Sequence, residues 1–176
     1  MAAYFIGEVR TLWLVEGAVG DDAPDRRMQL IDDFAFVDPN GVQWLAPAGH
    51  VIDGASIPRM LWSIAGDPFI GTYRRASVLH DAACDARTQP SKVVHRMFYD
   101  AMIADGTSQT QAIEFYTAVR LFGPHWDDPA PLTPMLARRR PGKPAPRNRV
   151  VKPKLKPRRR LKIDQVERAL DQALGE

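Results

Sequence analysis

The chain has 176 residues, a hydrophobic content of 45% and a formal net charge of +3, which suit one globular domain with appendages. No apolar run reaches the length of a membrane span, and the first residues lack a basic segment followed by a long apolar one, so we expect a soluble protein without a secretion signal. The single cysteine, Cys84, excludes an internal disulfide.

Charge divides the chain into two unlike parts. Residues 1–137 carry 10 Lys and Arg against 17 Asp and Glu, a balance of −7. Residues 138–176 carry 14 against 4, a balance of +10. We therefore expect a mildly acidic domain that carries a strongly basic extension.

The first half of the domain has the composition of β-strands. Aromatic and β-branched residues are frequent in residues 4–17 and 28–49. Within the second of these ranges, the sequence DPNG at residues 38–41 has the residue types of a tight hairpin turn. These patterns predict antiparallel hairpins or a small sheet.

The stretch VIDGASIPRMLWSIAG, residues 51–66, lies where strand patterns give way to helical ones. Gly54 permits a positive φ, Ser56 can cap the amides of a following helix, and Pro58 is tolerated in a first turn. Asp53 and Arg59 have no such local role. They are therefore candidates for a functional site.

Three helical patterns follow, in residues 72–86, 91–106 and 107–123. Each begins near a Ser or Thr, and glycines stand where the second and third should end. Strands followed by helices predict an α+β domain over residues 1–123, in which the sheet packs on a three-helix C-terminal half.

Two of these helices carry candidate metal ligands. His80 and Cys84 share one helix face, Asp81 adjoins His80, and His95 would point toward His80 if the helices pack as antiparallel neighbours. Imidazole, thiolate and carboxylate all bind zinc or manganese. The alternative is structural: a hydrogen-bonded core histidine and a small buried cysteine.

Beyond the domain, residues 124–160 are crowded with prolines, which prevent a continuous helix or sheet, so we expect an extended linker. Residues 161–176 regain helical spacing, with an apolar stripe of Ile163, Val166, Leu170 and Leu174. Residues 138–162 contain 13 Lys and Arg and no acid, which suits binding to the phosphates of a polyanion. The predicted polyanion-binding residues are Arg138, Arg139, Arg140, Lys143, Arg147, Arg149, Lys152, Lys154, Lys156, Arg158, Arg159, Arg160 and Lys162. The alternative is a solvated tail.

The succession DGASIPR (residues 53–59), VLHDAACDA (78–86), HRMFYDAM (95–102) and FYTAVRLFG (115–123) resembles the phage and prophage family known as domain of unknown function thirteen fifty-three. The resemblance covers roughly residues 34–123. Where that family usually has an Ala-Asp pair, this chain has Val94 and His95, which exchanges a carboxylate for an imidazole.

The resemblance implies a phage context, with the protein in the virion or in the host cytoplasm during assembly. Two functions follow as hypotheses. The first is a virion-associated protein whose basic arm and C-terminal helix bind other phage structural proteins, its own copies or DNA, without a membrane span. The second is a metal-dependent hydrolase, in which His80, Asp81 and His95 hold the ion while Asp53, Arg59 and Asp81 take catalytic roles.

Overall fold

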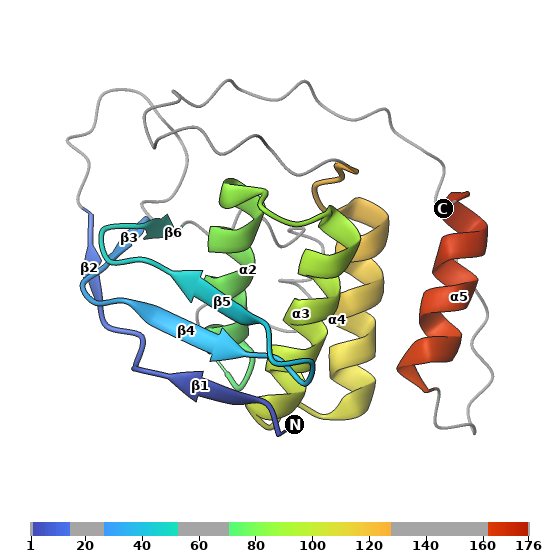
Figure 1. Ribbon diagram of the computed structural model, residues 1–176, viewed down its shortest axis with the longest axis horizontal. Coiled ribbons are helices and arrows are strands. Elements are labelled where there is room, and N and C mark those ends of the chain that lie inside the picture. The colour runs from blue at the N-terminus through green and yellow to red at the C-terminus, as the bar shows by residue number, and fades with distance from the viewer. Residues whose placement is uncertain (1, 15–26, 53–70, 128–161, 176) are drawn as a thin grey trace.

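The strands form the N-terminal layer of a computed structural model that describes residues 2–14, 27–52, 71–127 and 162–175 (Figure 1). Two antiparallel three-stranded sheets have the orders β1-β4-β5 and β2-β3-β6. The strands are β1 (Tyr4–Ile6), β2 (Thr11–Trp13), β3 (Met28–Leu30), β4 (Phe34–Val37), β5 (Gln43–Ala46) and β6 (Val51–Ile52). Since β3 runs on into β4 at the centre of both sheets, the two are successive halves of one bent ribbon.

The β4–β5 hairpin is organised by Asp38, which is 6% exposed. One carboxylate oxygen accepts hydrogen bonds from the amides of Asn40, at 2.8 Å, and Val42, at 3.0 Å. The other accepts from the indole of Trp44 at 3.2 Å. Gly41 has a φ of 83°, a conformation that favours glycine. The DPNG turn expected from the sequence is therefore confirmed.

Three helices form the second layer: α2 (Arg74–Ala86), α3 (Ser91–Ala104) and α4 (Gln109–Phe122). The Ser108 hydroxyl caps α4 by accepting from the amide of Gln111. At the other end of α4 a Cβ on Gly123 would lie 2.4 Å from the Val119 carbonyl oxygen, so only glycine fits there. The α+β class and all three predicted helices are confirmed, with ends shifted by three residues or fewer.

The core lies between these two layers. Phe34, Phe36 and Trp44 from the sheet pack with residues of α2, α3 and α4 in one buried cluster. Successive helices are neighbours, and α2 contacts β4, β5 and β6. The helices therefore cover one face of the sheet, as Figure 1 shows with β4 and β5 in front of α2 and α3.

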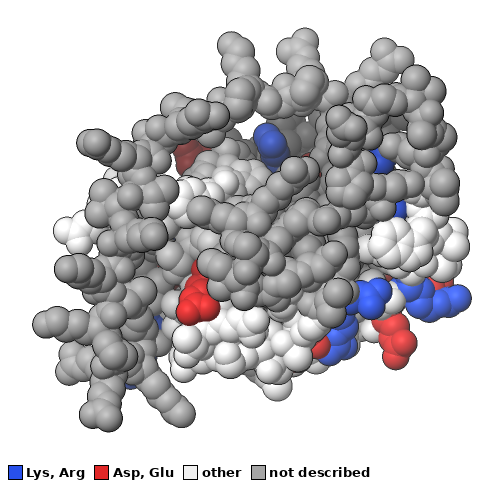
Figure 2. All heavy atoms as spheres, turned by 180° about the vertical axis from the view of Figure 1, so that it is seen from behind, with Lys and Arg blue, Asp and Glu red and all other residues white. Residues whose placement is uncertain are grey.

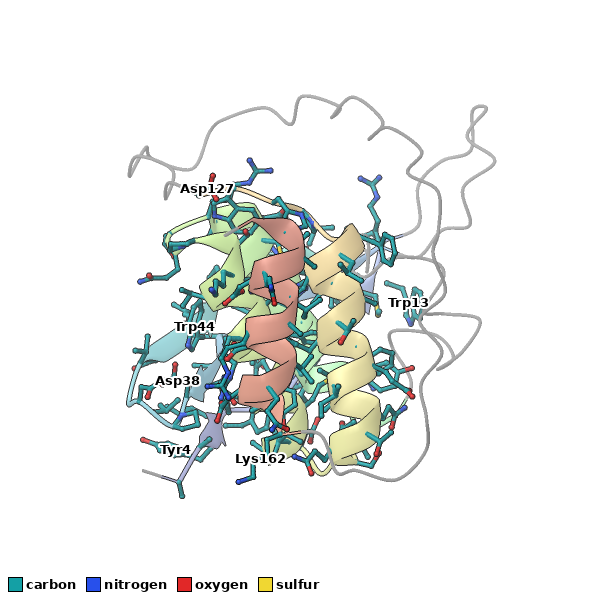
Figure 3. All side chains as sticks on the ribbon, turned by 90° about the vertical axis from the view of Figure 1, so that its right-hand side faces the viewer. Tyr4, Trp13, Asp38, Trp44, Asp127 and Lys162 are labelled. Carbon is teal, nitrogen blue, oxygen red and sulfur yellow. The ribbon has the colours of Figure 1, made fainter. Side chains whose placement is uncertain are left out.

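The C-terminal helix α5 (Ile163–Leu174) confirms the predicted amphipathic helix and packs against α4 (Figure 3). Leu170 is 7% exposed, while Ile163 and Val166 pack partly buried against the same core. Three of the four residues of the apolar stripe therefore dock on the domain of their own chain, whereas Leu174 is exposed. Among the described helices, none combines the length and apolar composition that a bilayer crossing requires.

Candidate functional site

His80 on α2 and His95 on α3 meet in the interior, and both are 0% exposed. Nε2 of His80 lies 2.9 Å from Nδ1 of His95. The sequence-based expectation that the two imidazoles point toward each other is confirmed. The short 87–90 connection makes α2 and α3 antiparallel neighbours, which places the two positions side by side.

The hydrogen-bond partners fix how the protons are distributed over the pair. Nε2 of His95 lies 3.1 Å from the carbonyl oxygen of Pro124, which can only accept, so this nitrogen donates. In the neutral ring Nδ1 of His95 then accepts, and Nε2 of His80 donates to it. Nδ1 of His80 is left with its lone pair, 3.8 Å from the sulfur of Cys84.

Burial keeps both imidazoles neutral. It is the main reason why the pKa of His95 is lowered to about 4 from the ordinary 6.5, with smaller effects of neighbouring groups that include His125 and Arg120. For His80, burial and then the proximity of His95 lower the pKa well below its ordinary value. A neutral hydrogen-bonded pair is the protonation state that both environments favour.

This arrangement limits how the pair can act as metal ligands. The lone pair of His95 is engaged by His80, so an ion bound to His95 would have to displace that hydrogen bond. Asp81 is 4% exposed beside the pair on α2. In the parts of the chain that the structure describes, no group of three or more His, Cys, Asp or Glu side chains is arranged to hold a metal ion. Asp53 and Arg59 lie outside those parts, so their convergence with His80 and Asp81 stays a prediction.

Residues 124–127 cover the histidine pair, although the sequence-based prediction placed this segment in the linker. Trp126 donates from its indole to the Gln89 carbonyl at 2.8 Å, and its own carbonyl accepts from the Ser91 amide at 3.1 Å. The Arg87 guanidinium lies 5.2 Å from the centroid of the Trp126 ring. A tryptophan amid prolines is a sequence signal that this position is anchored, but it does not say to which residues. The candidate site predicted from the sequence also did not include His50, whose Nε2 lies 3.8 Å from a carboxylate oxygen of Asp85.

A second polar cluster fastens α5 to α3 and α4. The Asp171 carboxylate forms salt bridges with Lys92 at 2.7 Å and with Arg120 at 3.0 Å. The Glu167 carboxylate forms a salt bridge with Arg96 at 2.6 Å and accepts a hydrogen bond from the Tyr116 hydroxyl at 2.9 Å. The main consequence concerns Arg120, which is 1% exposed and therefore a buried cation that needs a carboxylate.

The pKa values of this cluster agree with that view. Burial raises the pKa of Asp171, but hydrogen bonds from Lys92 and Arg120 outweigh it and leave the pKa lowered. Burial, followed by the proximity of Glu167, raises the pKa of Tyr116. Asp171 therefore stays ionised and Tyr116 stays a donor at neutral pH.

The predicted polyanion-binding residues 138–160 lie outside the described ranges, and Lys162 is the N-cap of α5. Both ends of this basic arm, residues 128–161, are nevertheless attached to described structure. Asp127 and Lys162 lie at opposite ends of the helical layer in Figure 3. On the face in Figure 2, the described charged side chains occur singly or in small groups of both signs. That face shows no basic patch among them.

The fold and the buried histidine pair define an α+β domain with a terminal helix docked on it. The profile of the family described as protein of unknown function (DUF1353) matches residues 28–119, more than half of the chain. The chain therefore belongs to this family, and the family membership expected from the sequence is confirmed.

Two curated proteins of Sinorhizobium fredii are similar to the chain. The uncharacterized protein y4jT is 44% identical over 106 residues, which are 60% of this chain and 32% of that protein. The uncharacterized protein y4iH is 44% identical over 94 residues, which are 53% of this chain and 39% of that protein. The chain thus spans well under half the length of these relatives. No solved structure matches it.

Proposed function

We propose that this chain is a phage virion-associated or assembly protein, in which the α+β domain holds a basic arm that binds nucleic acid. The observation that carries the proposal is the run of 13 Lys and Arg without an acid in residues 138–162. The phage context comes from the resemblance of the sequence to phage and prophage proteins. Because the cations lie among prolines and no aromatic residue occurs in this range, the arm should contact phosphates and not bases.

The docking of α5 supports this proposal. The first acidic residues after the arm are Asp164, Glu167 and Asp171, and each has a cationic partner on α3 or α4. Glu167 and Asp171 are therefore engaged by cations of the domain. In this proposal the cations of the arm pair with an external polyanion, whose condensed counterions they release on binding.

The test replaces the 12 Lys and Arg of residues 138–160 by Gln and keeps the prolines and α5. Deletion of residues 138–176 is a poorer test, because it also removes Asp171, an ion-pair partner of buried Arg120. The intact chain should retain DNA at low salt, with an affinity that falls roughly a thousandfold or more between 50 and 200 mM salt. The Gln variant should lose this retention.

The matched control replaces three exposed or half-exposed cations of the domain, Arg10, Arg74 and Arg87, by Gln. Retention by this control should be close to that of the intact chain. Equal DNA binding by the arm variant and the intact chain, or binding that is indifferent to salt, would exclude nucleic acid as the target of the arm.

The metal-dependent hydrolase is the second candidate, and the meeting of His80 and His95 favours it over other enzymes. It requires further ligands, for which Asp81 and Asp53 are the candidates. Elemental analysis of the purified chain and of a His80→Ala variant tests it. Zinc or manganese bound by the intact chain and lost in the variant would support the hydrolase. A chain that takes up neither ion on titration would leave the structural role.

A further inference from the structure

The ion pairs of α5 with α3 fix the direction in which α5 lies on the domain. Lys92, in the first turn of α3, binds Asp171 near the end of α5. One helical turn further along α3, Arg96 binds Glu167, which lies one turn earlier in α5. The two helices are therefore antiparallel.

The contacts of α5 with α4 agree with this direction. Tyr116 donates to Glu167, and Arg120, one turn later in α4, binds Asp171. These pairs rise together along both helices, so α5 is parallel to α4. The surface that binds α5 is formed by Lys92, Arg96, Tyr116 and Arg120 and is called the α5-binding surface below.

Because α5 is parallel to the helix that precedes the arm, the chain must return along the length of α5 before α5 begins. Figure 3 shows this, with Asp127 and Lys162 at opposite ends of the helical layer. Lys162 precedes Asp171 by nine residues, so the return covers at least about 14 Å along the helix axis. The 34 residues 128–161 span about 105 Å when extended. The arm is thus several times longer than docking within one copy requires.

The composition of the arm favours an extended chain over a compact return. Residues 128–161 contain 8 prolines and 12 Lys and Arg, against a single acid, Asp128. Proline-rich segments prefer the extended polyproline conformation, and charges of one sign repel each other along a linker. An extended arm carries α5 away from its own domain and within reach of another copy.

We propose that the α5-binding surface takes α5 from a second copy of this chain, so that two copies exchange their terminal helices. The incoming helix brings the same carboxylates to Lys92, Arg96 and Arg120, so the contacts formed between copies equal those given up within each copy. Reciprocal exchange with two-fold symmetry fills both surfaces. The exchange requires no nucleic acid and therefore goes beyond the proposed function.

Cross-linking of two single-cysteine variants tests the exchange. Arg96 and Asp164 lie 3.7 Å apart across the surface, so Arg96→Cys in one chain and Asp164→Cys in another can be joined by a short bismaleimide only when α5 of one copy docks on the other. Mass spectrometry identifies the mixed product. Its yield should rise about fiftyfold between about 10 µM and about 1 mM protein, because the tethered helix has an effective concentration in the millimolar range.

Three controls accompany this measurement. The unmodified chain should give no product, since Cys84 is buried. A chain with both substitutions should cross-link within itself at about 10 µM, where α5 stays on its own copy. Asp32→Cys, at another exposed aspartate, replaces Asp164→Cys in the third control and should lower the yield of mixed product at least about tenfold, to the level of random collisions.

A mixed product that is absent at about 1 mM, or equally abundant with Asp32→Cys, would overturn the proposal. So would a chain with both substitutions that does not cross-link within itself. If Arg96→Cys does not fold, sedimentation velocity of the unmodified chain decides the question. Dimers should then appear as the concentration approaches the millimolar range, and Asp171→Ala should reduce them. A chain that stays monomeric there, or dimers that Asp171→Ala leaves unchanged, would exclude the exchange.

Discussion

The two buried imidazoles couple protonation to folding. His80 and His95 share one hydrogen bond, and His95 passes a second to the Pro124 carbonyl. A proton added to the pair would have to reside on a ring without contact with water. The unfolded chain has no such restriction, so acid should favour unfolding.

We predict that the free energy of unfolding falls as the pH falls below about 6.5. The pKa of His95 is about 4 in the folded chain against the ordinary 6.5. Stability is therefore complete above 6.5, where both states are neutral, and is lost between 6.5 and 4, where only the unfolded chain binds the proton. His95 alone should cost about 2 kcal/mol by pH 5. Urea denaturation at pH 7 and pH 5 measures this loss.

The control for this prediction is His95→Gln, whose amide can donate to the Pro124 carbonyl and accept from His80 but does not titrate. It should show a clearly smaller loss over the same range. An intact chain that is equally stable at both pH values would contradict the neutral pair.

The second prediction for a single residue concerns the contribution of Asp38 to the free energy of unfolding. Its carboxylate accepts from two amides of the turn and from the Trp44 indole. Asp38→Ala should lower the free energy of unfolding by about 2–3 kcal/mol, because it leaves buried donors without a partner. Asp32→Ala, at a surface ion pair with Arg10, should change it by less than about 1 kcal/mol. Equal effects of the two variants in urea denaturation would refute this role.

At the scale of elements, α5 shows why a sequence pattern and a binding partner are different kinds of information. The stripe of Ile163, Val166 and Leu170 predicts a face that must be covered, but amphipathic spacing does not say by what. The answer depends on Lys92, Arg96 and Arg120, which face α5 from two other helices. Arg120 lies within an ordinary helical run, so only the assembled fold reveals that it is buried.

Features that depend on residues close in sequence could be predicted, whereas contacts between residues far apart in sequence could not. The DPNG turn and the cap at Ser108 fix elements through neighbours in sequence, and the short connection after α2 suffices to bring His80 and His95 together. The Trp126 anchor needed contacts with Gln89 and Ser91, more than thirty residues away, which no local pattern encodes. Which strands pair across the two sheets was likewise hidden, because strand order and register depend on contacts between segments far apart in sequence.

We predict that the buried end of α5 dominates its docking. Asp171→Ala should lower the free energy of unfolding by about 2–4 kcal/mol, because it withdraws a carboxylate from buried Arg120. Asp164→Ala is matched to it on the same helix. It should cost less than about 1 kcal/mol, since Asp164 is 69% exposed and lies 3.7 Å from Arg96. Urea denaturation of both variants tests the ranking, and a reversed order would contradict it.

At the scale of the whole molecule, the basic arm closes a loop between two attached ends. Trp126 holds one end against the 87–91 segment, and α5 holds the other against α3 and α4. A helix of 12 residues is marginal in water by itself, so α5 depends on its dock for its structure. Because the arm links α5 covalently to the domain, α5 is present at a high effective concentration beside the surface of α3 and α4 that binds it.

We therefore predict that cutting the arm releases α5. A specific protease site placed between Ala145 and Pro146 would leave both anchors intact, while α5 loses an effective concentration in the millimolar range. After cleavage and dilution to nanomolar concentration, the C-terminal fragment should dissociate, and the remaining domain should lose about 2–4 kcal/mol of stability because Arg120 is left without Asp171. Size-exclusion chromatography with mass spectrometry follows the fragment. An uncut chain with the same insertion is the control, and a fragment that remains bound at nanomolar concentration would show that α5 docks without the help of its tether.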